Sequence, residues 1–495
     1  MKVSLPLKPF QYQNLIDGKW QNAADGKTFE RYSPAHEVLV GIYPKSGEAD
    51  AILAIEAARK AFDEGIWPRM SGAERAAIIL KAASLIRKYA EELAFIETLE
   101  SGKPISQAKD EMEWAACNWD YAATLARHTK GESFNSLGED MLAIVVKEPI
   151  GVVSMITPWN FPLLIISQKL PLALAVGCTA VVKPSEFTSG TTLKLGGILK
   201  EAGLPDGVVN ILSGYGDPVG IAMTNHPMVD MISFTGSTSV GKRIAAAAGQ
   251  KLKKVELELG GKNPQIIFPD VDLTEVVDSV VFGVYFNMGE CCNSGSRILV
   301  HEDIADELIK KVIEKSKQVK VGDPLDPQVK VGAIINQQQM EKISGYFEQA
   351  ATQGAKLVLG GKATEHGNYI LPTIYDEVKP EMSIAKEEIF GPVLSIIRFK
   401  TLDEAIRIAN DTLYGLSASV WTKDIDKAMT ISRKVKAGTI WINTFMNGYA
   451  ELPFGGYKES GLGREMGAAA IDEFTEMKTI QIHIGPKTGW WISDK

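Results

Sequence analysis

The chain has 495 residues, of which 45% are hydrophobic and 23% are charged. This length exceeds the size at which a single hydrophobic core stops growing, so we expect two or three domains. The composition is ordinary for a soluble globular enzyme and excludes a disordered chain. Asp and Glu number 61 against 53 Lys and Arg, and the net charge of -8 predicts binding neither to nucleic acid nor to an anionic membrane.

The sequence also predicts the compartment. The N-terminal stretch MKVSLPLKPFQYQN has no signal or transit pattern. The apolar segment FPLLIISQKLPLALAVG is interrupted by Gln168 and Lys169 before it reaches the roughly 18 residues of a membrane span. Four cysteines in so long a chain indicate free thiols, and the histidines, His366 among them, lack the spacing of metal ligands. We predict a cytoplasmic protein without a metal site.

The predicted elements fall into groups along the chain. Apolar residues at steps of three and four predict packing helices over 48–130. From residue 151, runs such as GVVSMIT, TAVVKPS and MISFTGS alternate with helical stretches, which predicts a parallel sheet with crossover helices. Such a doubly wound α/β domain binds ligands at the carboxyl ends of its strands. A similar alternation from NPQIIF to GTIWINT predicts a second α/β domain.

Two strand-like segments fit neither domain. They are ESFNSLGEDMLAIVVKEPI, residues 132–150, and EMKTIQIHIGPK, residues 476–487. An isolated ribbon is marginally stable in water unless it packs on something else. A contact between subunits is one way to stabilise them.

Several short stretches carry residues suited to chemistry. In VELELGGKNP, Glu256 and Glu258 lie on one face of a strand by period two, and the strand ends before a glycine pair. In MITPWNFP, two prolines restrict the backbone around Asn160. VVKPSE ends a strand, and FTGSTSVG resembles a glycine turn that opens a phosphate-binding helix. Each stretch alone also fits an ordinary surface turn.

The stretch NMGECCNSGSR contains adjacent cysteines, Cys291 and Cys292. Taken in order, TPWNFP, KPSE, FTGSTxxG, ELGGKNP, this GxxC segment, EEIFGPV and PFGGYKESG resemble the aldehyde dehydrogenase superfamily across nearly the whole chain. The resemblance implies an α/β fold with a Rossmann-like cofactor domain, an α/β catalytic domain and a small β oligomerisation element. It assigns 1–130 and 151–261 to the first, 262–475 to the second, and 131–150 and 476–495 to the third.

The resemblance also implies the catalytic residues. The family nucleophile lies three residues after the glycine of a Gly-Gln-x-Cys motif, which here is Cys292. Asn160 would stabilise the oxyanion, and Glu258 would act as the general base that hydrolyses the thioester. Glu290 replaces the usual glutamine, and a carboxylate beside a thiol would disfavour the thiolate. The other cysteines, Cys117, Cys178 and Cys291, are expected to be small buried hydrophobes.

For the cofactor, the resemblance implies NAD, with NADP possible, because the carboxylate of Glu186 would accept hydrogen bonds from the ribose and repel a 2′-phosphate. The final glycine-rich motif, PFGGYKESG, is expected to be structural. The residues implied for the cofactor are Trp159, Lys183, Glu186, Gly236, Ser237, Gly241, Glu388 and Phe390.

The predicted substrate is a small-molecule aldehyde, either an amino-aldehyde, which the acid Glu451 would suit, or a medium aliphatic aldehyde. Gln168 stands where several family members carry tryptophan, which predicts a wider or more polar pocket. The pocket residues implied by the resemblance are Phe161, Ile165, Gln168, Cys291, Glu451 and Phe454.

Alternative functions stay open at this point. A coenzyme-A acylating enzyme of the family would lack the base, and a non-catalytic structural or binding protein would lack catalytic residues. A cofactor-free cysteine hydrolase would pair a histidine with Cys292, and no such motif is present. The resemblance further implies a homodimer or homotetramer, because the β element pairs between subunits in the family.

Overall fold

The computed structural model describes residues 5, 8–364, 367–486, 489 and 491–492. Part of the N-terminal stretch, His366 and the last residues of the 476–495 segment lie outside these ranges, so the expectations about them gain no structural account. Within the described ranges, no helix is long and apolar enough to cross a membrane.

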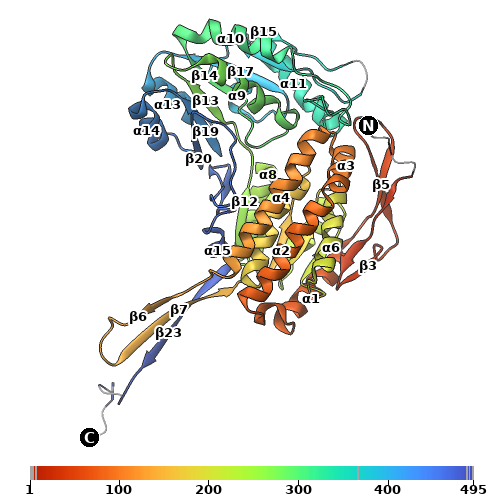
Figure 1. Ribbon diagram of the computed structural model, residues 1–495, viewed down its shortest axis with the longest axis vertical. Coiled ribbons are helices and arrows are strands. Elements are labelled where there is room, and N and C mark those ends of the chain that lie inside the picture. Colours follow the sequence, from red (N-terminus) through yellow and green to blue (C-terminus); the bar gives the residue numbers. More distant parts are fainter. Residues whose placement is uncertain (1–4, 6–7, 365–366, 487–488, 490, 493–495) are drawn as a thin grey trace.

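Two α/β bodies lie one above the other, and a β-ribbon projects from the lower body (Figure 1). The lower body contains an eight-stranded sheet. Its strands in spatial order are β22 (Gly461–Leu462), β12 (Lys254–Glu258), β11 (Met231–Thr235), β8 (Val152–Ile156), β9 (Thr179–Lys183), β10 (Val209–Ile211), β2 (Asn14–Ile16) and β3 (Lys19–Gln21).

The five strands from β12 to β10 are parallel, as the sequence predicts, whereas β22 and β2 join them antiparallel from distant parts of the chain. Lys183 pairs with Ile156, and Glu258 pairs with Thr235. The carboxyl ends of these strands therefore lie along one edge, where ligands bind in open α/β sheets.

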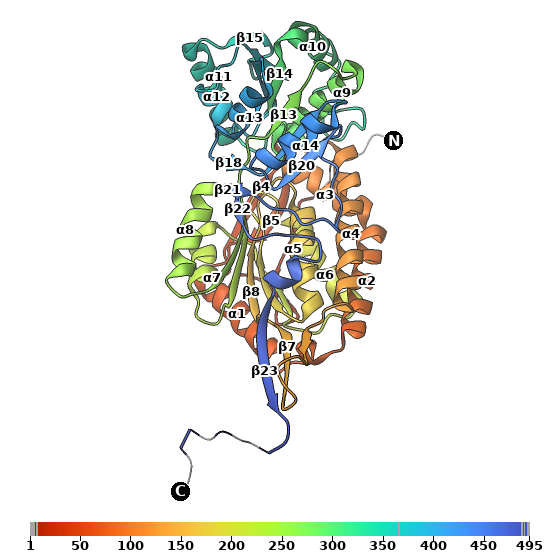
Figure 2. The same ribbon diagram turned by 90° about the vertical axis from the view of Figure 1, so that its left-hand side faces the viewer.

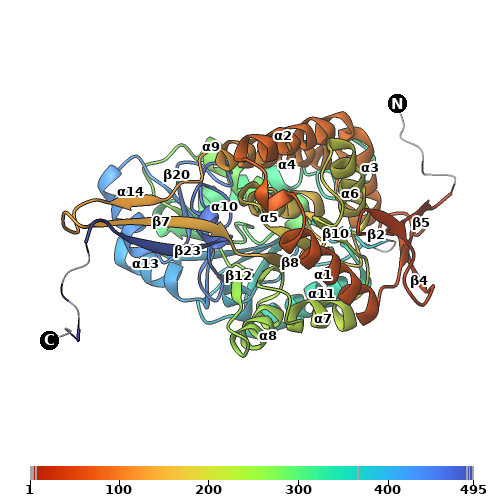
Figure 3. The ribbon, with the colours of Figure 1, turned by 90° about the horizontal axis from the view of Figure 1, so that it is seen from below.

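Helices cover both faces of this sheet (Figure 3). On β9, Val181 packs with α1 (Glu48–Asp63), while Ala180 and Val182 pack with α5 (Pro162–Val176) and α6 (Gly190–Ala202). This is the alternation expected of a strand buried on both faces. One face carries α1 (Glu48–Asp63), α7 (Ile221–Asn225) and α8 (Thr238–Gly249). The other face carries α2 (Gly72–Lys88), α3 (Ala90–Ser101), α4 (Ile105–Ala126), α5 (Pro162–Val176) and α6 (Gly190–Ala202).

The upper body is built on a seven-stranded sheet that is parallel except for the pair β15–β16. In order its strands are β15 (Lys356–Leu359), β16 (Thr373–Asp376), β17 (Val393–Phe399), β14 (Arg297–His301), β13 (Pro264–Ile267), β19 (Ser417–Trp421) and β20 (Thr439–Ile442). Its helices are α9 (Leu273–Tyr285), α10 (Glu302–Ser316), α11 (Gln337–Gln353), α12 (Ser383–Lys386), α13 (Leu402–Asn410) and α14 (Ile425–Lys434).

The two segments that fit neither domain pair with each other. Strand β7 (Met141–Pro149) lies between β6 (Glu132–Phe134) and β23 (Thr475–His483), which follows α15 (Ala470–Glu473), and both pairings are antiparallel. This three-stranded ribbon extends away from the lower body (Figure 1).

Smaller elements complete the fold. Strands β18, β21 and β22 lie between the two bodies (Figure 2), and β22 links the C-terminal part of the chain to β12. The remaining elements are β1 (Phe10–Gln11), β4 (Thr28–Tyr32), β5 (Leu39–Pro44), β18 (Tyr414–Gly415), β21 (Tyr457–Lys458) and the short helical turns η1 (Trp67–Arg69), η2 (Gly216–Gly220) and η3 (Phe286–Gly289).

Candidate active site

The two adjacent cysteines follow a strained turn between α9 and β14. Asn287, Met288 and Gly289 all have left-handed backbone angles, with φ of 48°, 58° and 72°. A Cβ on Gly289 would lie 2.2 Å from the carbonyl oxygen of Gly391, so only glycine fits there. Such a turn cannot extend the helix and directs the following residues, Cys291 and Cys292, out of it.

The structure distinguishes the two thiols. Cys291 is buried beside Phe161 and Ile165, whereas Cys292 is partly exposed. The main chain of Cys292 is held by Asn263, whose Nδ2 donates to the Cys292 carbonyl at 2.7 Å. A hydrogen bond with the Cys291 thiol and burial raise the pKa of Cys292 well above its ordinary value, with smaller contributions from Glu388 and Glu258.

The other cysteines only partly match the sequence prediction. Cys178 is buried, but Cys117 is exposed, so its predicted burial is wrong. Its sulfur lies on the outer surface of α4, 3.5 Å from the Glu113 carboxylate and 3.7 Å from Arg87. The small side chain of cysteine fits on either face of an amphipathic helix. The sequence alone did not show which face of α4 carries Cys117.

Asn160 follows β8 and lies against the cysteine loop. Its side-chain Nδ2 donates to the carbonyl oxygen of Glu290 at 3.1 Å. In return, the Asn287 amide donates to the carbonyl oxygens of Asn160, at 3.2 Å, and Glu290, at 2.9 Å. The structure therefore brings the Asn160 amide to the residues that directly precede Cys291 and Cys292.

Glu258 ends β12 at the carboxyl edge of the lower sheet and is 4% exposed. Its Oε1 has no hydrogen-bond partner among the described residues. Burial, followed by the charge of Glu465, raises the pKa of Glu258 well above its ordinary value, while Lys169 opposes the shift. A buried carboxyl group with a free oxygen is suited to exchanging a proton with a small molecule.

Glu256 shares a face with Glu258 but is already engaged by the protein. Its Oε2 accepts a hydrogen bond from Ser233 Oγ at 2.6 Å and lies 3.9 Å from the ammonium of Lys169. Lys169 also pairs with the buried Glu465. Sequence reasoning missed this cluster, because Lys169 and Glu465 are far apart in the chain.

The residues implied for the cofactor converge on the carboxyl edge of the lower sheet. Lys183 is buried at the end of β9, where burial lowers its pKa to about 8, and its Nζ lies 3.8 Å from Glu186 Oε2. Ser237 is the exposed residue before α8. The free N–H groups at the start of this helix can donate hydrogen bonds to a bound anion. Gly236 precedes Ser237, and a Cβ on Gly241 would lie 2.5 Å from Leu259.

On the opposite side, a loop of the upper body faces this edge. The ring of Phe390 meets that of Trp159 edge-on at 5.3 Å, and Phe390 has a left-handed φ of 60°. Glu388 Oε1 accepts the N–H of Gly261 at 2.9 Å, and burial raises the pKa of Glu388. Side chains from both bodies therefore border the same region.

The residues implied for the substrate separate into two groups. Phe161, Ile165 and Cys291 form a buried apolar cluster, against which Leu164, Phe286 and Met446 pack. Sequence reasoning missed these last three residues, although Leu164 lies in the first turn of α5, which directly follows Phe161.

The remaining pocket candidates do not belong to this apolar cluster. Gln168 is partly buried, and Glu451 is exposed near Tyr121, whose pKa is raised by burial and by the charge of Glu451. Phe454 pairs through its main chain with Glu465 at 2.7 Å and 2.8 Å.

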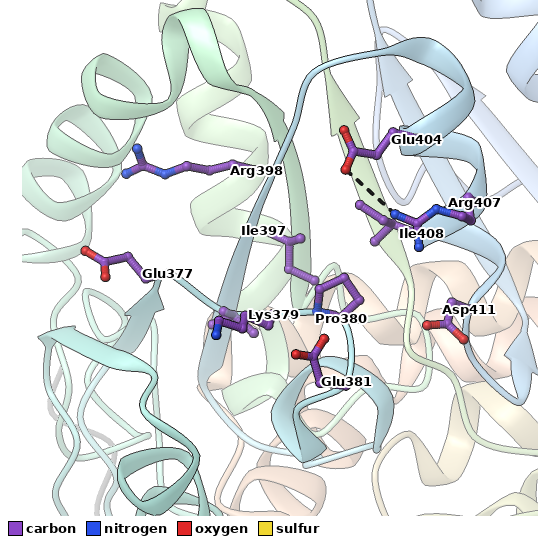
Figure 4. Close-up of a pocket in the computed structure, with 11 residues that line it drawn as sticks. Glu377, Lys379, Pro380, Glu381, Ile397, Arg398, Glu404, Arg407, Ile408 and Asp411 are labelled. Carbon is purple, nitrogen blue, oxygen red and sulfur yellow. Dashed lines mark ion pairs between the residues drawn. The ribbon is translucent and has the colours of Figure 1, made fainter.

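A surface hollow of about 460 Å³ lies elsewhere, in the upper body between β17 and α13 (Figure 4). Charged side chains border it, and they are largely paired with one another or with neighbours, as Arg407 is with Glu404 at 3.7 Å and Arg398 with Asp376 at 2.9 Å. It contains none of the residues singled out for chemistry. The described residues also include no cluster of potential metal ligands.

The fold and the site define a two-body α/β protein whose cysteine loop lies against the carboxyl edge of the lower sheet. The sequence pattern of the aldehyde dehydrogenase family matches residues 20–480, and the chain belongs to this family. It is 44% identical over 468 residues to aldehyde dehydrogenase family 2 member C4 of Arabidopsis thaliana, covering 94% of this chain and 93% of the relative.

Solved structures agree with this assignment. The NAD-dependent aldehyde dehydrogenase from Sinorhizobium meliloti is 49% identical with a TM-score of 0.97, and the match covers 98% of this chain and 97% of that one. Betaine aldehyde dehydrogenase from Staphylococcus aureus, solved in complex with NAD⁺, is 38% identical with a TM-score of 0.95, and the match covers 97% and 96%.

We expect alkylation of Cys292 by iodoacetamide to accelerate with pH, by about tenfold per unit between about pH 7 and 9, because the thiolate is the reactive form. The raised pKa of Cys292 leaves the thiol mostly protonated over this range, so the thiolate fraction grows as pH rises. Mass spectrometry of the modified peptides would measure the rate separately from that of the exposed Cys117. A rate that is already constant at neutral pH would contradict a raised pKa.

Proposed function

We propose that this protein oxidises an aldehyde to a carboxylic acid with NAD as the electron acceptor. The observation that carries the proposal is the grouping of three side chains at one place. Asn160 bonds to the residue preceding the cysteine pair, and the charge of Glu258 acts on the Cys292 thiol. The named relatives are aldehyde dehydrogenases.

In the proposed reaction, the thiolate of Cys292 attacks the aldehyde carbon, a carbon–sulfur bond forms, and the carbonyl electron pair moves onto oxygen. The Asn160 amide has two N–H groups, of which one already donates to the Glu290 carbonyl. We assign the other N–H and the main-chain N–H of Cys292 to the developing oxyanion. NAD, held by the residues at the carboxyl edge of the lower sheet, would supply the two-electron acceptor for the hydride that leaves this carbon.

Glu258 then acts as the general base that activates water against the thioester on Cys292. The water oxygen bonds to the acyl carbon, its proton passes to the carboxylate of Glu258, and the Cys292 sulfur leaves with its electron pair. Both glutamates keep one unpaired oxygen, but Glu256 Oε2 accepts a hydrogen bond from Ser233 and lies near Lys169, which favours Glu258 for this role. Retention of this base favours hydrolysis over transfer of the acyl group to coenzyme A.

The described residues fit NAD. The Glu186 carboxylate, beside the buried Lys183, offers acceptors for ribose hydroxyls and would repel a 2′-phosphate. The exposed N-terminus of α8 at Ser237 suits a pyrophosphate. Trp159 would lie near the pyrophosphate with Ser237, and Glu388 and Phe390 would border the nicotinamide ribose and ring. Gly236 precedes α8 and Gly241 lies in its first turn, where a Cβ would meet Leu259.

Substitution of the two catalytic candidates separates their roles. We expect Cys292→Ala to abolish NADH formation while NAD still binds, because the nucleophile is lost. Cys291→Ala, the matched control, should retain most activity. Glu258→Gln should leave the first-turnover burst of NADH largely intact and slow acid release by at least about a hundredfold.

Rapid-mixing absorbance of NADH, with assay of the free acid, would check these outcomes. Full activity of Cys292→Ala would refute the choice of thiol. An unchanged burst and steady state in Glu258→Gln would remove its role as the base.

For the substrate, we propose a neutral aldehyde with an apolar chain in preference to an amino-aldehyde. The wall beside Cys291 is apolar, with Phe161 stacked on Phe286 at 5.9 Å. The ring of Phe161 already lies 4.3 Å from the buried ammonium of Lys103. Lys103 pairs with the buried Glu97 and Glu111, so the preference for a neutral chain rests on the apolar wall and not on repulsion by Lys103. Glu451 and its neighbour Tyr121 keep the amino-aldehyde as the second candidate.

A steady-state panel would decide between these substrates. We expect kcat/KM for hexanal to exceed that for 4-aminobutyraldehyde by at least about tenfold, since burying one ammonium against an apolar wall is unfavourable. Each aldehyde would be assayed with NAD and with NADP, and NAD should be preferred. Glu451→Gln serves as the control and should leave the hexanal value unchanged. A preference for 4-aminobutyraldehyde that Glu451→Gln removes would establish the second candidate.

We further propose that residues 131–150 and 476–495 form an oligomerisation element in a homodimer or homotetramer, separate from a cofactor domain, 1–130 and 151–261, and a catalytic domain, 262–475. Strand β23 is an edge strand in the described part of the ribbon and exposes Met477, Ile480 and Ile482 by 75%, 39% and 40%. An exposed apolar edge strand has unpaired backbone N–H and C=O groups that can pair with a strand of another chain.

We expect the double variant Ile480→Lys and Ile482→Lys to be monomeric in light scattering, because two charges on one strand face oppose pairing. Gln481→Lys, on the opposite face, is the matched control. Retained NAD binding by the monomer would support the division into domains. An unchanged molar mass would contradict the oligomerisation role.

The four free cysteines also support the proposed cytoplasmic location. Fractionation of cells that express the protein would test it.

A further inference from the structure

Glu290 directly precedes the cysteine pair, yet its side chain is bonded to a distant segment. Glu290 is 1% exposed, and its Oε1 accepts the main-chain N–H of Ile335 at 3.2 Å. The sequence predicts instead that this carboxylate acts on the neighbouring thiol. The buried bond to Ile335 gives the side chain a different role.

The segment that contains Ile335 is itself firmly held. The carbonyl oxygen of Ile335 accepts a hydrogen bond from Arg31 Nη2 at 3.1 Å. The next residue, Asn336, caps α11 by accepting the N–H of Gln339 at 2.8 Å. Glu290 is therefore attached to the rigid start of a helix.

That helix start reaches the loop we assign to the nicotinamide. Gln339 Nε2 donates to the carbonyl oxygens of Ile389, at 3.2 Å, and Phe390, at 2.7 Å. On the other side, Glu388 bonds to Gly261, and a Cβ on Gly261 would lie 2.4 Å from the carbonyl oxygen of Cys292. A closed ring of contacts thus runs from the cysteine loop through Glu290, α11 and Phe390 back to Cys292.

We propose that Glu290 is a positioning residue, whose carboxyl group fixes the loop bearing Cys292 relative to the segment that ends at Phe390. The proposal rests on the proposed function in one respect, that Cys292 is the nucleophile. Asn160 and Asn287 hold only the main-chain carbonyl of Glu290. The bond between the Glu290 side chain and Ile335 adds a second point of attachment. Because Glu290 is then held both at its carbonyl group and at its side chain, its backbone cannot rotate.

The chemistry of the bond predicts which substitutions preserve it. Burial raises the pKa of Glu290, while the Ile335 N–H, Lys103 and Arg31 oppose the shift. The protonated and ionised forms both keep an acceptor oxygen, and so does a glutamine amide. A leucine removes the acceptor and leaves a buried N–H unpaired, and an aspartate is shorter by one methylene.

The test compares Glu290→Gln, Glu290→Leu and Glu290→Asp in the full-length protein. We expect Glu290→Gln to match the wild type. Glu290→Leu and Glu290→Asp should slow the first-turnover burst of NADH by about tenfold or more, because a small displacement of the nucleophile is costly. Their KM for NAD should stay within about twofold of the wild-type value, which a general loss of structure would not produce.

Asp50→Leu provides the matched control. Asp50 is 3% exposed and also accepts main-chain N–H groups, from Ala24 and Gly47 at 2.8 Å each, but it lies at the start of α1, outside the cysteine loop and the segment of Ile335. Its loss should lower the midpoint of thermal unfolding and leave the burst rate unchanged. If Glu290→Leu does not fold, Glu290→Asp decides the question.

A wild-type burst rate in the folded Glu290→Leu or Glu290→Asp variant would overturn the proposal. A Glu290→Gln variant as slow as Glu290→Leu would also overturn it, because charge and not the acceptor would then matter. Cys292→Ala measured in parallel separates this result from the proposed function: a remaining burst in that variant refutes the nucleophile assignment, whatever Glu290 does.

Discussion

The left-handed turn from Asn287 to Gly289 is the constraint on which the candidate site depends. Two of its residues, Asn287 and Met288, are not glycine. A left-handed backbone costs each of them about 1–3 kcal/mol and persists only where the surrounding structure holds it. The surroundings do so here, because the Asn287 side chain bonds to the carbonyl oxygens of both Asn160 and Glu290. The same amide that stabilises the turn thus joins the cysteine loop to the loop after β8.

Burial controls the electrostatics of the site. A hydrogen bond with Cys291 together with burial raises the pKa of Cys292, the proposed nucleophile, and burial raises the pKa of Glu258, the proposed base. Lys169 is the nearby buried cation, but it pairs with Glu465 and lies near Glu256. Glu256 is therefore held by Ser233 and Lys169, whereas Glu258 lacks such a hydrogen bond, although each of the two keeps one unpaired oxygen.

Much of the architecture was accessible from sequence patterns. Short valine-rich and isoleucine-rich runs predicted β8, β9 and β11, and period two placed Glu256 and Glu258 on one face. Ranking these two glutamates required Lys169 and Ser233, which lie on other elements. Cys117 shows the same limit, because the exposed face of α4 depends on which helices pack against it.

The sequence by itself determined the order of motifs, hence the family, the two α/β domains and the residue types that meet at the strand ends. Local periodicity and turn chemistry carry that information within a few residues. Only the tertiary structure decided that Cys292 is the partly exposed residue of the cysteine pair, that Glu256 and not Glu258 bonds to Ser233, and that Glu290 bonds to Ile335. These outcomes depend on burial and on hydrogen-bond partners distant in the chain, which no local pattern records.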